Sequence, residues 1–304
     1  MTPPPPSQRP VRAAVTERAL GAVRARAPER AQVLPLDPDT DLDAVDFLVP
    51  EAGDRSIVDR LAGLEQLAVV QVLSAGTDWI ERHVPAQATL CNARGARDAP
   101  VAEWILGALL GTSTRLLECA RSRTWHRRAL TDLGGSAVVI VGMGSIGRLL
   151  GSWLQALDVE VIGVASHARG DLRGIDELED LLPRADAVVL LTPLTGATRG
   201  LISARELAAM RDGALLVNAA RGPVVDTDAL LAEVGSGRLR AVLDVTDPEP
   251  LPDGHPLWSA PGVLSITPHI AGDSPRGHER AAQLAGQQLA RWCAGEELIN
   301  IVRR

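Results

Sequence analysis

Three polar residues of different chemistry each follow a short apolar run in the second half of the chain: Arg221, Glu249 and His269. In an open parallel α/β sheet the ligand crevice lies outside the carboxyl ends of the strands, so groups that follow successive strands can converge on one bound molecule. A guanidinium, a carboxylate and an imidazole together suit an anionic carbonyl compound, because they offer charge, hydrogen bonds and a proton. The pattern therefore predicts an enzyme.

The elements that must position these groups are short apolar runs separated by helical patterns such as residues 203–210 and 227–234. Continuous apolar runs of this kind are typical of strands that are buried on both faces of a parallel sheet. In the second half they cover residues 137–141, 160–164, 188–191, 214–217, 241–243 and 263–266. In the first half they cover residues 11–15, 32–36, 45–49 and 67–73, with a helical stretch at 17–26. We therefore expect an α/β protein with doubly wound parallel sheets.

The order of the elements predicts two domains, which 304 residues can accommodate. Residues 100–121 form a long helical pattern with proline in its first turn, and we expect this helix to lead into the second domain. The last helical pattern, 276–294, and the tail at 298–302 have no place in the second strand series, so we expect them to return to the first domain. The prediction is a Rossmann cofactor domain at 98–272, inserted into a flavodoxin-like substrate domain at 1–97 and 273–304.

A glycine motif, Gly142-x-Gly144-x-x-Gly147, directly follows the run at 137–141 and opens a helical pattern. Such glycines permit a tight turn, close approach of the backbone to a diphosphate, and close packing of the helix on the sheet. This context predicts a dinucleotide site. The alternative is a glycine-rich turn without a ligand.

The residue after the next strand, where an NAD enzyme usually has an acid for the ribose hydroxyl, is Ala165. It is followed by Ser166, His167 and Arg169, whose side chains suit a 2′-phosphate. We therefore expect NADP(H) as the preferred cofactor and NAD(H) as a possible one. The alternative is that Arg169 points into solvent.

Several further motifs carry a family resemblance: Val217-Asn218-Ala219-Ala220-Arg221-Gly222, Leu243-Asp244-Val245 with Glu249-Pro250, Thr267-Pro268-His269-Ile270-Ala271-Gly272, Val72-Leu73-Ser74-Ala75-Gly76 and Asn92-Ala93-Arg94-Gly95. By these motifs the chain resembles the D-isomer-specific 2-hydroxyacid dehydrogenases over nearly its whole length. The segment at 166–169 and the run at 255–258 resemble the glyoxylate and hydroxypyruvate reductase branch. The resemblance implies reduction of a small 2-keto acid with NADPH.

The resemblance assigns a role to each of the three polar residues. Arg221 would hold the substrate carboxylate and polarise the keto oxygen, because a planar guanidinium can bond to both. His269 would be the general acid, and Glu249 would bond to it and fix its tautomer. The alternatives are a surface ion pair for Arg221, a loop cap for His269 and an exposed loop position for Glu249.

In the first domain, the loop of Ser74, Ala75 and Gly76 would offer backbone N–H groups to the substrate carboxylate. The alternative is an ordinary helix entry, with Thr77 or Asp78 as its N-cap. Asp244 would lie near the nicotinamide, or would hold the end of its strand. The expected cofactor contacts are Gly142, Gly144, Ser145, Ile146, Gly147, Ser166, His167, Arg169, Thr192, Pro193, Ala219 and Asp244.

Composition excludes other classes of function. The net charge is −7, and no basic run interleaves with aromatic residues, so we expect no nucleic-acid partner. The 31 basic side chains are all Arg, which excludes a Schiff-base lysine and a P-loop lysine. The 3 cysteines form no close pair, so we expect no metal site and a reducing, cytoplasmic location. The proline-rich residues 1–10 fit neither a secretory signal nor a membrane span, and are expected to be a disordered lead-in.

The resemblance also implies a homodimer, with the helix at 100–121 as the expected contact. Two other readings stay open. Some proteins with this fold are nucleotide-sensing binding partners, and others are formate or phosphite dehydrogenases.

Overall fold

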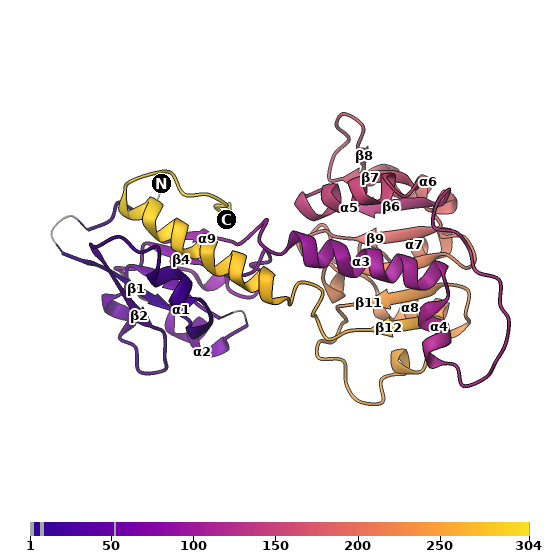
Figure 1. The fold of residues 1–304 in the computed structure, drawn as a ribbon, viewed down its shortest axis with the longest axis horizontal. Helices are drawn as coiled ribbons and strands as arrows, with labels where there is room; N and C mark the ends of the chain where they lie inside the picture. Colours follow the sequence, from indigo (N-terminus) through magenta and orange to yellow (C-terminus); the bar gives the residue numbers. More distant parts are fainter. Residues whose placement is uncertain (1–2, 7–8, 52, 304) are drawn as a thin grey trace. The chain divides into compact units, whose positions relative to one another are not determined.

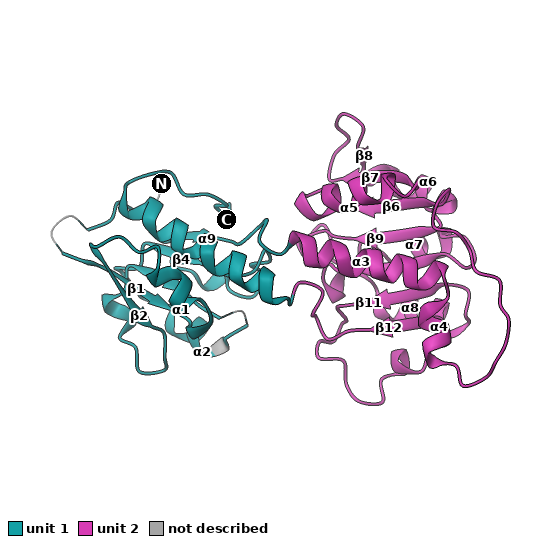
Figure 2. Ribbon diagram, viewed as in Figure 1, with its two compact units in different colours: residues 1–97, 273–304 teal, residues 98–272 magenta. Residues whose placement is uncertain are grey.

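The computed structural model describes residues 3–6, 9–51 and 53–303 and divides the chain into two compact units (Figure 2). Unit 1 comprises residues 1–97 and 273–304, and unit 2 comprises residues 98–272. Each unit is built around its own parallel sheet, and each is described separately below.

Unit 1 contains a five-stranded sheet in the order β2-β1-β3-β4-β5, and every pair in it is parallel. Its strands are β1 (Val11–Val15), β2 (Ala31–Pro35), β3 (Phe47–Val49), β4 (Val69–Gln71) and β5 (Thr89–Cys91). This is the flavodoxin-like order, as expected. The three-residue strand β5 was not predicted, because its apolar run is too short to stand out.

The helices of unit 1 cover both faces of this sheet. Helix α1 (Glu17–Arg24) packs against α9 (Pro275–Cys293) on one face, where the ring centroids of Phe47 and Trp292 lie 6.1 Å apart. Helix α2 (Arg55–Arg60) and its C-cap residue contribute Ile57 and Leu61 to the core on the other face. Alternate residues of β1 enter the two cores, as the two-residue repeat of a strand requires.

The C-terminal tail belongs to unit 1. Cys91 forms an antiparallel bridge with Ile301, and the Val302 N–H donates to the Leu90 carbonyl at 2.9 Å. At the other terminus, disorder was the wrong prediction for the part of residues 1–10 that is described. The Pro3 carbonyl accepts from the Trp292 indole at 2.9 Å, and the Pro6 carbonyl accepts from Arg30. Met1, Thr2, Ser7 and Gln8 lie outside the described residues.

Unit 2 contains a seven-stranded parallel sheet in the order β12-β11-β10-β9-β6-β7-β8. Its strands are β6 (Ala137–Val141), β7 (Glu160–Ala165), β8 (Arg173–Gly174), β9 (Ala187–Leu190), β10 (Leu215–Asn218), β11 (Arg240–Leu243) and β12 (Val263–Ile266). The chain starts in the middle at β6, runs outward to β8, and then returns to β9 on the other side of β6. This reversal is the topological switch point of a Rossmann fold, where ligands bind.

Helices cover both faces of the unit 2 sheet. On one face, α3 (Asp98–Ser113) and α5 (Ser145–Gln155) lie side by side over the sheet (Figure 1) and bury Ile105, Leu150 and Leu154. On the other face, α6 (Leu178–Leu181), α7 (Ala204–Ala209) and α8 (Thr227–Gly235) bury a second core. Two parallel sheets, each with helices on both faces, confirm the predicted fold class.

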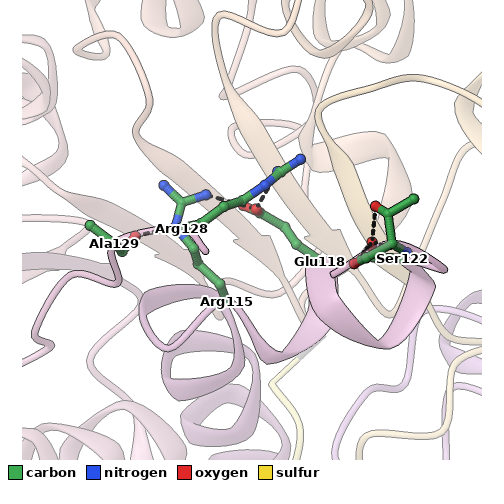
Figure 3. A network of polar contacts seen from close by, with 6 residues as sticks. Arg115, Glu118, Ser122, Arg128 and Ala129 are labelled. Carbon is green, nitrogen blue, oxygen red and sulfur yellow. Dashed lines mark hydrogen bonds and ion pairs between the residues drawn. The ribbon is translucent and has the colours of Figure 1, made fainter. Parts of the chain in front are cut away.

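The predicted single helix at 100–121 is wrong, because it is broken into α3 and α4 (Leu116–Arg121). The break falls at Arg115, whose φ is 58°. The preceding Thr112, Ser113 and Thr114 bond their hydroxyls to carbonyls of the preceding turn of α3, which weakens a helix. After the break, the Glu118 carboxylate accepts from Arg115 at 2.7 Å and from Arg128 at 3.3 Å (Figure 3).

Within the described residues, no helix combines the length and the apolar character that crossing a membrane requires.

Candidate active site

The glycine motif forms the turn between β6 and α5, and two of its glycines are required by contacts within the protein. Gly142 has a φ of 113°, and a Cβ there would lie 2.7 Å from the Leu191 carbonyl carbon. A Cβ at Gly147 would overlap the Gly142 carbonyl oxygen. These two glycines therefore set the tight turn and the close packing of α5 on the sheet.

Gly144 is different, because a Cβ there would meet nothing within 4 Å. It is the N-cap of α5 and provides no side-chain cap. The N–H groups of Ser145, Ile146 and Gly147 have no acceptor inside the helix, since these groups begin the first turn. The turn thus presents uncapped N–H groups and open space, which is what a bound diphosphate needs.

A buried hydroxyl without a partner lies at the same edge of the sheet. Thr192 follows β9, next to Leu191, which packs on Gly142, and its Oγ1 is buried without a hydrogen bond to any described residue. A buried polar atom of this kind normally has a partner. The residues present therefore fit a dinucleotide bound across the switch point, where one of its polar groups would reach Thr192.

The segment after β7 carries the residues expected to select the cofactor. Ala165 ends the strand and offers no carboxylate, and Ser166, His167 and Arg169 follow it in exposed positions. None of these three side chains bonds to another side chain in the described part of the protein. The next cation, Arg173, is paired with Glu177 at 3.2 Å.

Arg221 follows β10, in a loop that the Asn218 side chain holds by hydrogen bonds. The buried Asn218 side chain donates to the Arg221 carbonyl at 3.1 Å and accepts from the Ala220 N–H at 3.0 Å. The Arg221 guanidinium donates to the Ala220 carbonyl at 2.8 Å. Next to it, Gly222 packs so tightly on the following loop that a Cβ would overlap the Thr246 carbonyl oxygen.

Asp244 follows β11 and holds the loop that contains His269. Its buried carboxylate accepts from the Thr267 hydroxyl at 2.6 Å and from the N–H groups of Ile270 at 2.8 Å and Ala271 at 3.0 Å. The His269 N–H donates to the Asp244 carbonyl at 2.8 Å. These bonds favour the structural alternative for Asp244. They also fix His269 in a left-handed conformation, with a φ of 57°.

His269 and Glu249 are brought together, 20 residues apart in sequence. The His269 Nδ1–H donates to Glu249 Oε1 at 2.7 Å, and the two side chains are 46% and 40% exposed. Burial raises the pKa of Glu249, but the hydrogen bond and charge of His269, a backbone bond from Thr246 and the Arg221 charge outweigh it. The pKa of Glu249 therefore lies below its ordinary value. The Arg221 loop also contacts the Glu249 loop at Gly222 and Thr246, so Arg221 and the His269–Glu249 pair lie on adjoining loops.

The loop of Ser74, Ala75 and Gly76 lies in unit 1. The Ser74 hydroxyl donates to the Gly76 carbonyl at 2.7 Å, and the Asn92 amide donates to the Ala75 carbonyl at 2.9 Å. The N–H groups of Ser74, Ala75 and Gly76 have no acceptor among the described residues. Asn92, from the Asn92-Ala93-Arg94-Gly95 motif, thus holds the loop and leaves its donors free.

The residues that hold the loops of the site in place were not predicted to do so from the sequence. They are Asn218, Gly222, Thr246, Thr267 and Asn92. A polar residue at the end of a strand is a signal for Asn218, but no local pattern indicates the others. In the described residues, no group of three or more His, Cys, Asp or Glu side chains is arranged to hold a metal ion.

A Rossmann unit with an open glycine turn and a paired His and Glu near an Arg defines an oxidoreductase of the nicotinamide-dependent class. Residues 106–271 match the model of the family described as D-isomer specific 2-hydroxyacid dehydrogenase, NAD binding domain. The chain belongs to the D-isomer specific 2-hydroxyacid dehydrogenase family, and it is an oxidoreductase with a nicotinamide cofactor.

Individual relatives and solved structures are similar to this chain over most of their length. The glyoxylate reductase of Thermofilum pendens is 32% identical over 277 residues, which is 84% of this chain and 80% of the relative. A D-isomer specific 2-hydroxyacid dehydrogenase from Xanthobacter autotrophicus, in complex with NADPH and MES, has a TM-score of 0.84 and 26% identity, covering 97% of this chain and 98% of its own. The NADPH-dependent glyoxylate/hydroxypyruvate reductase of Sinorhizobium meliloti, in complex with NADP and sulfate, has a TM-score of 0.83 and 25% identity, with the same coverage.

Proposed function

We propose that this protein reduces a small 2-keto acid of the glyoxylate or hydroxypyruvate type to the 2-hydroxy acid, with NADPH as the preferred cofactor. The observation that carries the proposal is the 2.7 Å bond from His269 Nδ1 to Glu249, close to Arg221. It combines a proton donor, a group that orients the donor, and a cation for the substrate carboxylate.

His269 is the proposed general acid. Because Nδ1–H is bound to Glu249, the protonated imidazole offers its second proton at Nε2. That proton passes to the keto oxygen as the carbonyl carbon is reduced, and in the reverse reaction Nε2 accepts it. The lowered pKa of Glu249 keeps the carboxylate ionised and able to stabilise the imidazolium.

Arg221 is the proposed substrate anchor. Its planar guanidinium can hold the substrate carboxylate and polarise the keto oxygen together, which stabilises the charge that develops on that oxygen. The free N–H groups of Ser74, Ala75 and Gly76 are proposed as further donors to the carboxylate. Unit 1 would thus contribute to substrate binding.

Unit 2 is the proposed cofactor domain, and the bound nicotinamide would supply the hydride. Gly142, Gly144, Ser145, Ile146 and Gly147 would hold the diphosphate. Thr192, Pro193 and Ala219 are proposed to border the rest of the cofactor, and Asp244 to lie beside it while its carboxylate holds the His269 loop. Ser166, His167 and Arg169 would bind a 2′-phosphate, since these exposed side chains have no other partner in the described structure and Ala165 offers no acid to a ribose hydroxyl.

The direct test is to mix the purified protein with NADPH, and separately with NADH, and to follow loss of the reduced-nicotinamide absorbance with glyoxylate, hydroxypyruvate, pyruvate and phenylpyruvate. Faster turnover with NADPH and the two smallest polar acids is the expected result. Cofactor binding without turnover on any keto acid would favour a nucleotide-sensing binding protein. Oxidation of formate or phosphite with NADP or NAD would favour a formate or phosphite dehydrogenase.

Two further properties are part of the proposal. A homodimer is expected, and light scattering on the eluted protein would measure its mass. A cytoplasmic location agrees with the free state of Cys91, Cys119 and Cys293, and fractionation of cells that express the protein would test it.

A further inference from the structure

The segment between β7 and β8 is a tight hairpin that projects from unit 2 (Figure 1). The Arg169 N–H donates to the Leu172 carbonyl at 3.1 Å, and the Leu172 N–H donates to the Arg169 carbonyl at 3.0 Å. Gly170, at the turn, has a φ of 59°. Arg169 and Leu172 are therefore fixed opposite each other, so whatever holds Leu172 also holds the backbone of Arg169.

The side chain of Leu172 is held over Gly163 of β7. A Cβ at Gly163 would lie 2.8 Å from Leu172 Cδ2 and 2.8 Å from Met143 Cγ. Leu172 and Met143 thus both pack on Gly163, in the space that its absent side chain leaves. A larger residue at position 163 would displace both of them.

Met143 belongs to the glycine turn, because it stands between Gly142 and Gly144. Its side chain runs from Gly163 to α5, where a Cβ at Gly151 would lie 3.9 Å from Met143 Cε. The glycine turn, through Met143, and the hairpin that carries Arg169, through Leu172, therefore pack on the same residue, Gly163.

The far end of the hairpin is held as well. The Gly174 N–H donates to Glu177 Oε1 at 2.9 Å, and a Cβ at Gly174 would lie 3.3 Å from the Ala168 nitrogen. Arg173 is neutralised by Glu177. Arg169 is thus the one guanidinium of residues 166–174 with no partner in the described structure.

We propose that Met143 and Leu172 are positioning residues for cofactor selection. Their packing on Gly163 holds the backbone of Arg169 at a fixed place relative to the glycine turn, so that one dinucleotide can reach both. Because the backbone that carries Arg169 is held before binding, less conformational freedom is lost when a phosphate arrives than if the whole hairpin had to become ordered. This inference rests on the proposed preference for NADPH.

The test is calorimetric titration of the full chain with 2′,5′-ADP and with 5′-ADP, which differ by the 2′-phosphate and need no turnover. Leu172→Ala is expected to weaken binding of 2′,5′-ADP by about tenfold, near 1.4 kcal/mol, and to change binding of 5′-ADP by less than about twofold, within ordinary surface effects. Met143→Ala is expected to weaken binding of 2′,5′-ADP more than binding of 5′-ADP as well. The double variant should lose less binding free energy than the sum of the two single losses, because both side chains pack on Gly163.

Two controls separate selection from general loosening. Leu231→Ala removes a similar, partly buried leucine of α8 on the other face of the sheet, and should leave both affinities unchanged. Leu172→Met retains an apolar side chain and should restore selectivity. Equal losses for the two nucleotides, or no loss for either, would overturn the inference.

Arg169→Ala tests the proposed cofactor preference separately. If it loses the discrimination between 2′,5′-ADP and 5′-ADP while Leu172→Ala keeps it, the phosphate assignment stands and the positioning role is wrong. If Arg169→Ala keeps the discrimination, the cofactor preference itself is wrong.

Discussion

Gly222 and Thr246 are in backbone contact, so close that a Cβ at Gly222 would overlap the Thr246 carbonyl oxygen and lie 2.7 Å from the Asp247 nitrogen. The contact joins the loop of Arg221 to the loop of Glu249. The three nearest atoms that a new Cβ would meet all belong to the backbone, so none can move as a flexible side chain does. The distance between Arg221 and Glu249 therefore depends on the absence of one methyl group.

Gly222→Ala should accordingly separate the two loops. We expect a loss of stability of about 1–3 kcal/mol from overpacking, and a loss of turnover larger than this stability effect explains. Urea denaturation and steady-state kinetics on the same preparation would measure both. Gly235→Ala, at an open helix position in the same unit, is the matched control and should be harmless. Normal turnover in Gly222→Ala would show that the spacing is not critical.

Asp244→Asn tests the bonds that hold the His269 loop. The buried carboxylate accepts three hydrogen bonds. In the asparagine variant one carboxylate oxygen becomes an NH₂ group, which cannot accept a bond and would point at an N–H donor of the loop. We expect a loss of about 1–3 kcal/mol in the free energy of unfolding. Turnover should fall too, because the left-handed conformation of His269 depends on its neighbours. Asp253→Asn, at an exposed position, should change neither, and equal behaviour of the two variants would contradict the role of Asp244.

Glu249 predicts a pH dependence with a defined sign. Its pKa in the folded protein lies below the ordinary value of 4.5, so its ionised form stabilises the fold above that pH. This contribution is lost as the pH falls through the lower, folded pKa. The free energy of unfolding of Glu249→Gln should therefore fall less steeply than that of the wild type below pH 4.5. The side chain is 40% exposed, so solvent screening keeps the difference small. Parallel curves from urea titrations at several pH values would count against the prediction.

Arg221→Lys separates charge from geometry. A lysine retains the charge but cannot hold a carboxylate and a keto oxygen in one plane. We expect a rise in KM and a fall in kcat, with kcat/KM lowered by about a hundredfold, or 2.7 kcal/mol. Binding of NADPH, followed by its fluorescence, should remain nearly unchanged. A defect confined to NADPH binding would show that Arg221 binds the cofactor and not the substrate.

Thr192→Val is expected to leave stability unchanged or slightly higher and to weaken NADPH binding. The Oγ1 atom is buried without a partner, so its removal should leave the free protein as stable as before or slightly more stable. If a bound cofactor reaches this hydroxyl, its removal should weaken NADPH binding by about fivefold to tenfold, or roughly 1 kcal/mol. Thermal unfolding without and with NADPH would measure the two effects. Unchanged affinity would show that the cofactor does not use Thr192.

The local sequence determined the parts of this protein that depend on neighbouring residues. The apolar runs that became β1, β6 and β12 have the bounds predicted for them, and the glycine motif lies between a strand and a helix as expected. The short strand β5 and the helix break at Arg115 were missed. In both places a few weak local preferences compete, and contacts from the rest of the fold decide the outcome.

The tertiary structure decided how the polar residues meet. Nothing near His269 in sequence indicates that Asp244 holds its loop, and nothing near Gly222 indicates the backbone of Thr246. The same holds for Met143 and Leu172, which both pack on Gly163. These pairs are 24 to 29 positions apart, so their proximity arises from sheet order and close packing rather than from local periodicity. The sequence by itself determined which chemical groups stand at the strand ends, and the packing between loops determined which of them touch.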